Sequence, residues 1–199
     1  MNKIIVGILL FVFIFISISL GKIMLIIEII FTLSLIEFIY VYIQNKKKIK
    51  KNKIICSNLS FIFGCFIIGL VNYIIKYKIF NSKIIIQTLL LSNLNDIAQM
   101  YWGKLYGKTK ITKISPNKTL EGYIGGYITL LFTKIFTNFY NFKFMNLVYI
   151  SNIIGDLFFS YIKRLIKIKD YSKILGSHGG INDRIDSFIF AINSIYFFY

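Results

Sequence analysis

The segment IIVGILLFVFIFISISL (residues 4–20), followed after Gly21 and Lys22 by IMLIIEIIFTLSLIEFIYVYI (residues 23–43), decides the fold class. Each run is close to the roughly 20 apolar residues that a helix needs to cross a bilayer. A secretory signal peptide would explain the first run, but no small-residue cleavage site follows it and a second apolar run begins at once. The pair therefore predicts a retained helical hairpin.

Apolar runs of the same kind recur along the rest of the chain. The 199 residues are 56% hydrophobic and include a single proline, which excludes an ordinary soluble domain. We predict an all-α, polytopic membrane helix bundle with about seven transmembrane helices, forming one integral membrane domain over residues 1–199. The expected spans are 4–20, 23–43, 54–75, 84–102, 122–137, 144–162 and 185–199.

Basic residues are unevenly distributed between the connections. With seven spans, the loops 44–53, 103–121 and 163–184 lie on one side of the membrane, and they hold 17 of the 24 lysine and arginine residues. The positive-inside rule predicts that these loops face the cytoplasm. We expect the protein to lie in an inner or cell membrane. The net charge of +16 does not indicate nucleic acid, because the basic residues interrupt spans instead of forming one soluble face. Membrane lipid headgroups and nucleotide phosphates are the partners we expect.

Most of the acidic residues lie in or beside the two later loops. They are Asp96, Glu121, Asp156, Asp170, Asp183 and Asp186. Asp183 and Asp186 are three residues apart and would share a helix face. Asp156 lies inside the sixth predicted span, and Lys163 and Arg164 follow that span directly. Because Mg²⁺ prefers carboxylate oxygens, the three aspartates at positions 156, 183 and 186 form a candidate Mg²⁺ site. The alternative is a network of ion pairs that ties two helix ends together.

Two further glutamates, Glu28 and Glu37, lie in the second predicted span, nine positions apart and on opposite sides of a helix. Ionisable side chains inside a membrane usually mark functional cavities, whereas a glutamate near the interface is merely solvated. Both interpretations stay open for each residue.

The lone histidine, His178, lies in Ser177-His178-Gly179-Gly180. No second histidine or suitable cysteine accompanies it, so the sequence does not predict a zinc site. The glycine pair lets backbone amides approach a phosphate closely, although most such pairs are simply turns.

Several motifs together resemble the phosphatidate cytidylyltransferase (CDP-diacylglycerol synthase) family. The signature-like stretches are Ser160-Tyr-Ile-Lys163-Arg164, Lys169-Asp170-Tyr-Ser172 and Gly176-Ser-His178-Gly179-Gly180-Ile-Asn-Asp183-Arg184-Ile-Asp186, preceded by Gly155-Asp156-Leu157. An upstream block is similar too, with Asn95-Asp96, Gly103-Lys104-Leu-Tyr-Gly107-Lys108, Ser115-Pro116-Asn-Lys118-Thr119-Leu-Glu121-Gly122 and Gly125-Gly126. The similarity covers roughly residues 92–190. One departure is Phe159, where bacterial members commonly have a glutamate.

The resemblance implies an enzyme that joins CTP and phosphatidate into CDP-diacylglycerol and releases pyrophosphate, with Mg²⁺ as cofactor. Whether the site binds a second cation, monovalent or divalent, is left open, and so is whether the protein forms a homodimer. It implies that Asp156, Asp183 and Asp186 bind the metal and that Lys163 and Arg164 act with them in catalysis. The residues implied in substrate binding are Asp96, Ser115, Lys118, Thr119, His178, Gly179, Gly180 and Arg184.

Other functions remain open at this point. A membrane lipid or polyprenol kinase would also bind nucleotide and Mg²⁺, but its product would carry no cytidylyl group. A transporter or scaffold would use Glu28, Glu37, Asp96 and Asp156 to line an ion path. A degenerate synthase would bind lipid without catalysis.

Overall fold

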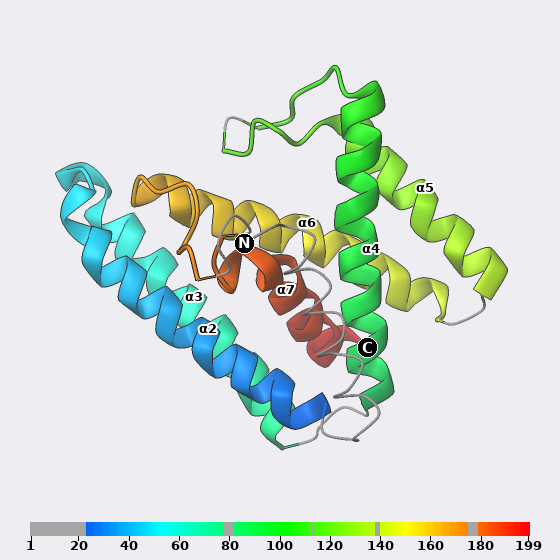
Figure 1. Cartoon of the computed structure of the whole chain (residues 1–199), viewed down its shortest axis with the longest axis horizontal. Helices are drawn as coiled ribbons and strands as arrows, with labels where there is room; N and C mark the ends of the chain where they lie inside the picture. The colour runs from blue at the N-terminus through cyan, green and yellow to red at the C-terminus, as the bar shows by residue number, and fades with distance from the viewer. Residues whose placement is uncertain (1–22, 78–81, 113, 138–139, 175–178) are drawn as a thin grey trace. The chain divides into compact units, whose positions relative to one another are not determined.

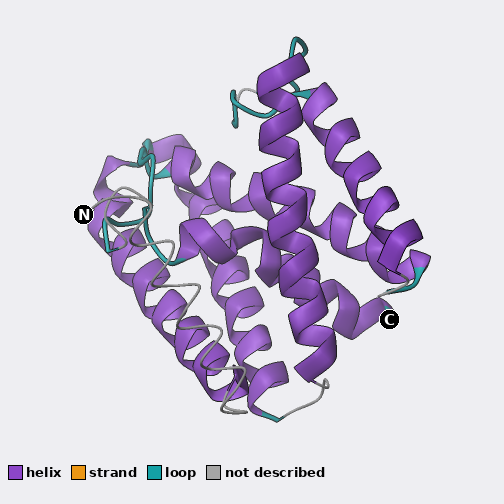
Figure 2. Ribbon diagram, turned by 45° about the vertical axis from the view of Figure 1, so that its right-hand side comes forward, coloured by secondary structure: helices purple, strands orange, loops and turns teal. Residues whose placement is uncertain are grey.

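The computed structural model describes residues 23–77, 82–112, 114–137, 140–174 and 179–199. These residues form long helices joined by loops, and none of them belongs to a β-strand (Figure 2). The helices are α2 (Ile23–Asn45), α3 (Ile54–Lys76), α4 (Ser82–Tyr106), α5 (Leu120–Thr137), α6 (Phe142–Leu165) and α7 (Asn182–Phe198), with short 3₁₀ turns at Lys46–Lys48 and Lys51–Lys53. The all-α prediction is therefore confirmed for the described residues, whereas the expected span 4–20 lies outside them.

Within the described residues, three helical segments are long and apolar enough to cross a membrane, namely Met24–Lys48, Ile54–Ile75 and Phe142–Leu165. The predicted count of about seven spans is thus not confirmed. The reason is visible in α4, which buries a row of polar side chains that includes Gln87, Ser92, Asn95 and Gln99. Such residues lower the mean hydropathy of a helix even where they face the protein interior.

The chain divides into two compact units. The first comprises residues 1–82 and 162–186, and its α2 and α3 lie side by side (Figure 1). The ring of Phe61 stacks on Phe38 at 5.5 Å and on Tyr42 at 3.9 Å. Gly64 permits this close approach, since an added Cβ would lie 2.6 Å from Cζ of Phe38.

The second unit comprises residues 83–161 and 187–199. Its α4 and α5 approach closely where the ring of Trp102 lies over Gly125, and Trp102 Nε1 donates a hydrogen bond of 3.0 Å to Thr129 Oγ1. Helix α6 joins them through Tyr149, whose hydroxyl donates to the carbonyl oxygen of Tyr123 at 3.0 Å. This packing holds the end of α4 against the start of α5, on either side of the connecting loop.

Candidate active site

The connection between α4 and α5 contains a tight turn at Ser115–Lys118. The amide of Lys118 donates to the carbonyl oxygen of Ser115 at 3.1 Å, and the amide of Ser115 donates to Thr112 Oγ1 at 3.2 Å. Pro116, the chain's single proline, occupies the second position of the turn, where its fixed φ is favourable. The turn thereby sets the position of Lys118.

Lys118 links this turn to two helices of the second unit. Its ammonium forms an ion pair with the carboxylate of Asp156 on α6, and it donates a hydrogen bond of 3.2 Å to Gln99 Oε1 on α4. The two charged side chains are 24% and 20% exposed, so the pair is only partly shielded from solvent. Two residues predicted from separate motifs, 38 positions apart in the sequence, are therefore in direct contact.

A third predicted residue, Asp96, lies beside this ion pair. Its Oδ2 accepts a hydrogen bond of 2.9 Å from Ser187 Oγ on α7. Burial alone would lower the pKa of Lys118, but the negative charges of Asp156 and Asp96 outweigh it and raise that pKa above the ordinary lysine value. Lys118 is therefore a permanent cation near neutral pH, suited to holding phosphate and unsuited to accepting a proton.

Thr119 and Glu121 close the base of the same loop. Thr119 Oγ1 accepts a hydrogen bond of 3.2 Å from the amide of Gly122 and so caps α5. The Glu121 carboxylate accepts bonds of 3.1 Å from the amides of Lys108 and Thr109. Hydrogen bonds from its own amide and from Thr109 and Lys108 lower the pKa of Glu121 to about 2. A direct substrate contact of Thr119 stays a prediction.

In the first unit, Asp183 is the centre of a second cluster. Its Oδ1 accepts from Lys163 Nζ at 2.8 Å, and its Oδ2 accepts from the amides of Tyr171 at 2.8 Å and Gly180 at 2.9 Å. The side chain of Asp183 is 8% exposed. Gly179 has φ of +84°, and an added Cβ there would lie 2.9 Å from Asp183 Oδ2. The glycine pair thus lets the loop backbone pack closely against the Asp183 carboxylate. The amide of Gly180 is already bonded to this carboxylate and is not left open for a phosphate.

Tyr171 covers one side of this cluster. Lys163 Nζ lies 5.4 Å from the centre of the Tyr171 ring, a cation–π contact. Burial, together with the negative charges of Asp186, Asp183 and Glu37, raises the pKa of the Tyr171 phenol well above its ordinary value. The phenol is therefore neutral at any physiological pH. Asp186 is also buried, at 7% exposure.

The remaining predicted site residues are not brought together in either of these two clusters. Arg164 and Arg184 are exposed, and Arg164 Nη1 donates to the carbonyl oxygen of Ile168 at 3.4 Å. His178 lies outside the described residues. Among the residues with described positions, no group of three Asp, Glu, His or Cys side chains that could hold a metal ion is found. Asp183 and Asp186 belong to the first unit and Asp156 to the second, so their common metal site stays a prediction.

The motifs now have a structural context, with Lys118 bound to Asp156 in one cluster and Lys163 bound to Asp183 in the other. A family model described as the cytidylyltransferase family matches residues 1–199. The chain belongs to this family.

Individual relatives agree with this assignment. The chain is 39% identical over 123 residues to a phosphatidate cytidylyltransferase of Helicobacter pylori (strain ATCC 700392 / 26695), a match that covers 58% of this chain and 46% of that protein. It is 36% identical over 129 residues to the phosphatidate cytidylyltransferase of Aquifex aeolicus (strain VF5), covering 62% and 50%. It is 40% identical over 126 residues to the uncharacterized protein YnbB of Escherichia coli (strain K12), covering 59% and 42%. The chain spans about half the length of the curated relatives it matches.

One important residue of this cytidylyltransferase-family chain was not identified as such from sequence. Glu37, 5% exposed on α2, accepts hydrogen bonds from the amide of Asn182 at 2.8 Å, from Asn182 Nδ2 at 2.9 Å and from the amide of Ile181 at 3.3 Å. The hydroxyl of Ser172 donates to the same carboxylate. The signal was a charge within an apolar run, which must find partners to be tolerated. Glu37 is neither a cavity residue nor solvated, because it holds the start of α7.

The family departure at Phe159 also has a structural explanation. Phe159 is fully buried on α6, with its ring perpendicular to Phe190 on α7 at 6.2 Å and close to perpendicular to Phe158 at 5.5 Å. The side chain contributes to an aromatic core of the second unit. A polar role at this position is therefore absent from this member of the family.

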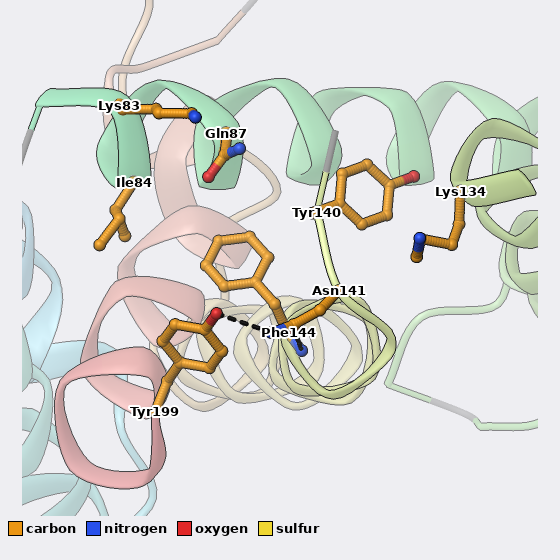
Figure 3. A pocket seen from close by; sticks show the side chains of 8 residues that line it. All are labelled: Lys83, Ile84, Gln87, Lys134, Tyr140, Asn141, Phe144 and Tyr199. Carbon is orange, nitrogen blue, oxygen red and sulfur yellow. Dashed lines mark hydrogen bonds between the residues drawn. The ribbon is translucent and has the colours of Figure 1, made fainter. Parts of the chain in front are cut away.

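The cytidylyltransferase-family chain also contains a cavity of about 440 Å³ in the second unit (Figure 3). Its lining residues are Lys83, Ile84, Gln87, Lys134, Tyr140, Asn141, Phe144 and Tyr199. They come from the start of α4, the end of α5, the connection into α6 with its first turn, and the residue that follows α7. Gln99 lies near the other end of α4, and Lys118 and Asp156 lie outside α4. No predicted site residue lines this cavity, so it is not the candidate active site.

Proposed function

We propose that this chain acts as a phosphatidate cytidylyltransferase in phospholipid biosynthesis, converting CTP and phosphatidate into CDP-diacylglycerol and pyrophosphate. A phosphate oxygen of phosphatidate attacks the α-phosphorus of CTP and forms a new P–O bond. The bond between that phosphorus and the oxygen bridging to the β-phosphate breaks, and its electron pair leaves with pyrophosphate. Phosphatidate is already ionised near neutral pH, so no general base is required.

The contact between Lys118 and Asp156 is the observation that carries this proposal. Each residue belongs to a different family motif, and the turn that contains Pro116 brings the two side chains together. Transfer between two highly anionic substrates requires charge neutralisation and alignment more than covalent assistance. Lys118, protonated and half-buried, supplies a fixed positive charge of this kind.

Lys163 plays the corresponding part in the first unit. Its ammonium is held by Asp183 and by the ring of Tyr171, so its position is fixed before substrate binds. Arg164 and Arg184 are exposed and follow Lys163 and Asp183 directly in sequence. A guanidinium group can contact two phosphate oxygens at once, so Arg164 and Arg184 are suited to binding the pyrophosphate portion of CTP.

The donor chemistry of the three aspartates fits Mg²⁺, because all of their ligand atoms are carboxylate oxygens. Asp156, Asp183 and Asp186 would hold the ion, which supplies neutralisation of nucleotide phosphate charge when bound. We further propose that the site faces the cytoplasm from the cell membrane, where CTP is available. Phosphatidate would keep its acyl chains in the bilayer beside the apolar helices.

The test is transfer of label into lipid by the purified, detergent-solubilised chain. Two parallel reactions contain phosphatidate, Mg²⁺ and CTP labelled either at the α-phosphate or at the γ-phosphate. We expect α-label, and no γ-label, in the lipid extract, because a cytidylyltransferase retains only the α-phosphorus. Lipid that carries γ-label would instead identify a lipid kinase.

Variants make the assay specific to the proposed site. Asp156→Asn and Asp183→Asn should each reduce turnover by on the order of 100-fold or more, while Asp170→Asn, which removes a charge from an exposed position, should retain most of it. Gel filtration confirms that the variants remain folded. Near-normal turnover in either of the first two variants would remove that aspartate from the site, and no label from the parent chain would contradict the proposed activity.

A further inference from the structure

Near Lys118, the buried polar atoms Asn95 Oδ1, Gln99 Nε2 and the hydroxyl of Tyr123 have no hydrogen-bond partner among the described residues. Asn95 is fully buried, Gln99 is 4% exposed and Tyr123 is 7% exposed. Buried polar groups are nearly always hydrogen-bonded, because leaving one unsatisfied forfeits its solvation. Three such atoms beside the candidate active site indicate a place prepared for a polar ligand.

The three side chains lie on facing surfaces of α4 and α5. Asn95 and Gln99 are one helical turn apart on α4 and share a face. Both pack against Gly126 on α5, where an added Cβ would lie 2.9 Å from Asn95 Oδ1 and 2.7 Å from Gln99 Cγ. Tyr123 is one turn before Gly126, and it lies close enough to Lys118 to act on the charge of that lysine.

Lys118 orients the side-chain amide of Gln99. Because its ammonium donates to Gln99 Oε1 at 3.2 Å, the Gln99 amide is oriented with Nε2, a donor, left to bind something else. Asn95 Oδ1 is an acceptor, and the Tyr123 hydroxyl can donate. The three side chains therefore offer one acceptor, one donor and one hydroxyl to a ligand.

This pattern is complementary to one edge of cytosine. The base carries an exocyclic amine that donates, followed by ring nitrogen N3 and carbonyl O2, which accept. Uracil has the opposite arrangement at the first two positions, with a carbonyl that accepts and an N3–H that donates. We propose that Asn95, Gln99 and Tyr123 recognise the cytosine base of the nucleotide, with Asn95 accepting from the amine, Gln99 donating to N3 and Tyr123 donating to O2.

This assignment rests on the proposed function, since it places the base of CTP beside the lysine that neutralises its phosphates. Lys118 contacts both Gln99 and Asp156, so the same side chain orients the base-reading amide and lies next to the proposed reaction centre. Sites built to hydrogen-bond a substrate reject analogues that leave those groups unpaired. Selection of CTP over UTP is the property that these residues would control.

The test compares CTP with UTP in the full chain and in Gln99→Glu. The substitution keeps the shape of the side chain and an acceptor for Lys118, but replaces the Nε2 donor with a second acceptor. We expect the ratio of kcat/KM for CTP to that for UTP, measured with α-labelled nucleotides, to fall by about tenfold or more, as for the loss of one base-edge contact. Asn93→Ala, an exposed position on the same helix, is the matched control and should leave the ratio unchanged.

A second readout separates this inference from the proposed function. Thermal stabilisation of each protein by CTP and by UTP, without phosphatidate, reports base selection independently of turnover. A chain that makes no CDP-diacylglycerol but is stabilised by CTP over UTP, with the preference lost in Gln99→Glu, would support base recognition and contradict the activity. If instead Gln99→Glu lowers activity with CTP and UTP equally, Gln99 only positions Lys118, and the proposed base contact is overturned.

Discussion

The Glu37 carboxylate on α2 accepts hydrogen bonds from both the backbone amide and the side-chain amide of Asn182, at 2.8 and 2.9 Å. Asn182 is the first residue of α7, so a negative charge from α2 lies at the positive end of that helix. Ser34 completes the contact, donating to Asn182 Oδ1 at 2.7 Å and accepting from Asn182 Nδ2 through its carbonyl oxygen at 2.8 Å. Residues 145 positions apart thus fix the start of the helix that carries Asp183.

Replacing Glu37 by glutamine should destabilise the first unit. One carboxylate oxygen becomes an NH₂ group, which cannot accept from the amide of Asn182 or the hydroxyl of Ser172, so at least one buried donor loses its partner. We expect a loss of about 1–3 kcal/mol in the free energy of unfolding. Thermal unfolding in detergent, followed by circular dichroism, measures this as a lowered midpoint.

Glu28→Gln is the matched control for Glu37→Gln, since it removes a carboxylate from the same helix at a half-exposed position. Its midpoint should change much less than that of Glu37→Gln. Equal changes in the two variants would show that the loss of charge, and not the loss of the contact with Asn182, is responsible.

Helix positions were predictable from sequence because a helix that crosses a bilayer needs an almost unbroken apolar run of about 20 residues. The expected span 54–75 corresponds to α3 at Ile54–Lys76, and 23–43 to α2 at Ile23–Asn45. The run 84–102 underestimated α4, which continues to Tyr106. Its last turn carries Gly103 and Lys104, which interrupt the apolar pattern but pack against the start of α5 through Gly103.

Contacts between motifs were predictable only in part. The acidic residues and the lysines were recognised as site candidates, because charges in an apolar chain need a function or a partner. Which partner each would find depends on tertiary packing, so neither the pairing of Lys118 with Asp156 nor the bond from Lys118 to Gln99 has a sequence signal. Gln99 was missed for the same reason, as an uncharged residue in the middle of a helix, and Asn95 was noted only as part of the family-like motif with Asp96.

The ion pair of Lys118 with Asp156 should persist at alkaline pH. Because nearby carboxylates raise the pKa of Lys118 when the chain is folded, the pair contributes stability that is fully present below the unfolded lysine value of about 10.4 and is lost as pH rises through the higher folded value. Turnover should therefore show no loss due to this lysine between pH 7 and about 10. Lys118→Met, which removes the cation, should reduce kcat/KM by on the order of 100-fold.

A pH–rate profile of the parent chain and of Lys118→Arg checks this prediction. Arginine retains the charge, so its profile should have the same alkaline limb even if its rate is lower. An inflection near pH 8 that is present in the parent chain and absent in Lys118→Arg would show that Lys118 titrates, contrary to the expected raised pKa.

Glu121 should keep the loop 107–119 closed over a wide pH range. Its carboxylate binds the amides of Lys108 and Thr109, and its pKa is lowered to about 2. The contact therefore contributes stability above the ordinary glutamate value of 4.5, and this contribution is lost as pH falls from there through about 2. At neutral pH, Glu121→Gln removes the charge and should make trypsin cleave after Lys108 and Lys110 severalfold faster, as measured by mass spectrometry.

Asp170→Asn serves as the control in the same digestion, because it removes a charge from the exposed loop that follows α6. It should leave the cleavage rate after Lys108 unchanged. If Glu121→Gln also leaves that rate unchanged, the loop is held by the antiparallel bridge between Lys110 and Thr119 and not by the carboxylate.

Placing a glutamate at position 159, as the family resemblance led us to expect, should not improve this protein. Phe159 is fully buried against Phe190 and Phe158, so Phe159→Glu would place a carboxyl group in an aromatic core of the second unit. We expect a loss of more than about 3 kcal/mol in the free energy of unfolding, or failure to fold. Phe159→Leu, which keeps the site apolar, should cost about 1–2 kcal/mol. Thermal unfolding and lipid labelling of both variants distinguish the cases. A Phe159→Glu protein with an unchanged midpoint and higher turnover would mean that this position reaches the reaction centre. A lowered midpoint, together with retained turnover in Phe159→Leu, would establish Phe159 as a core residue.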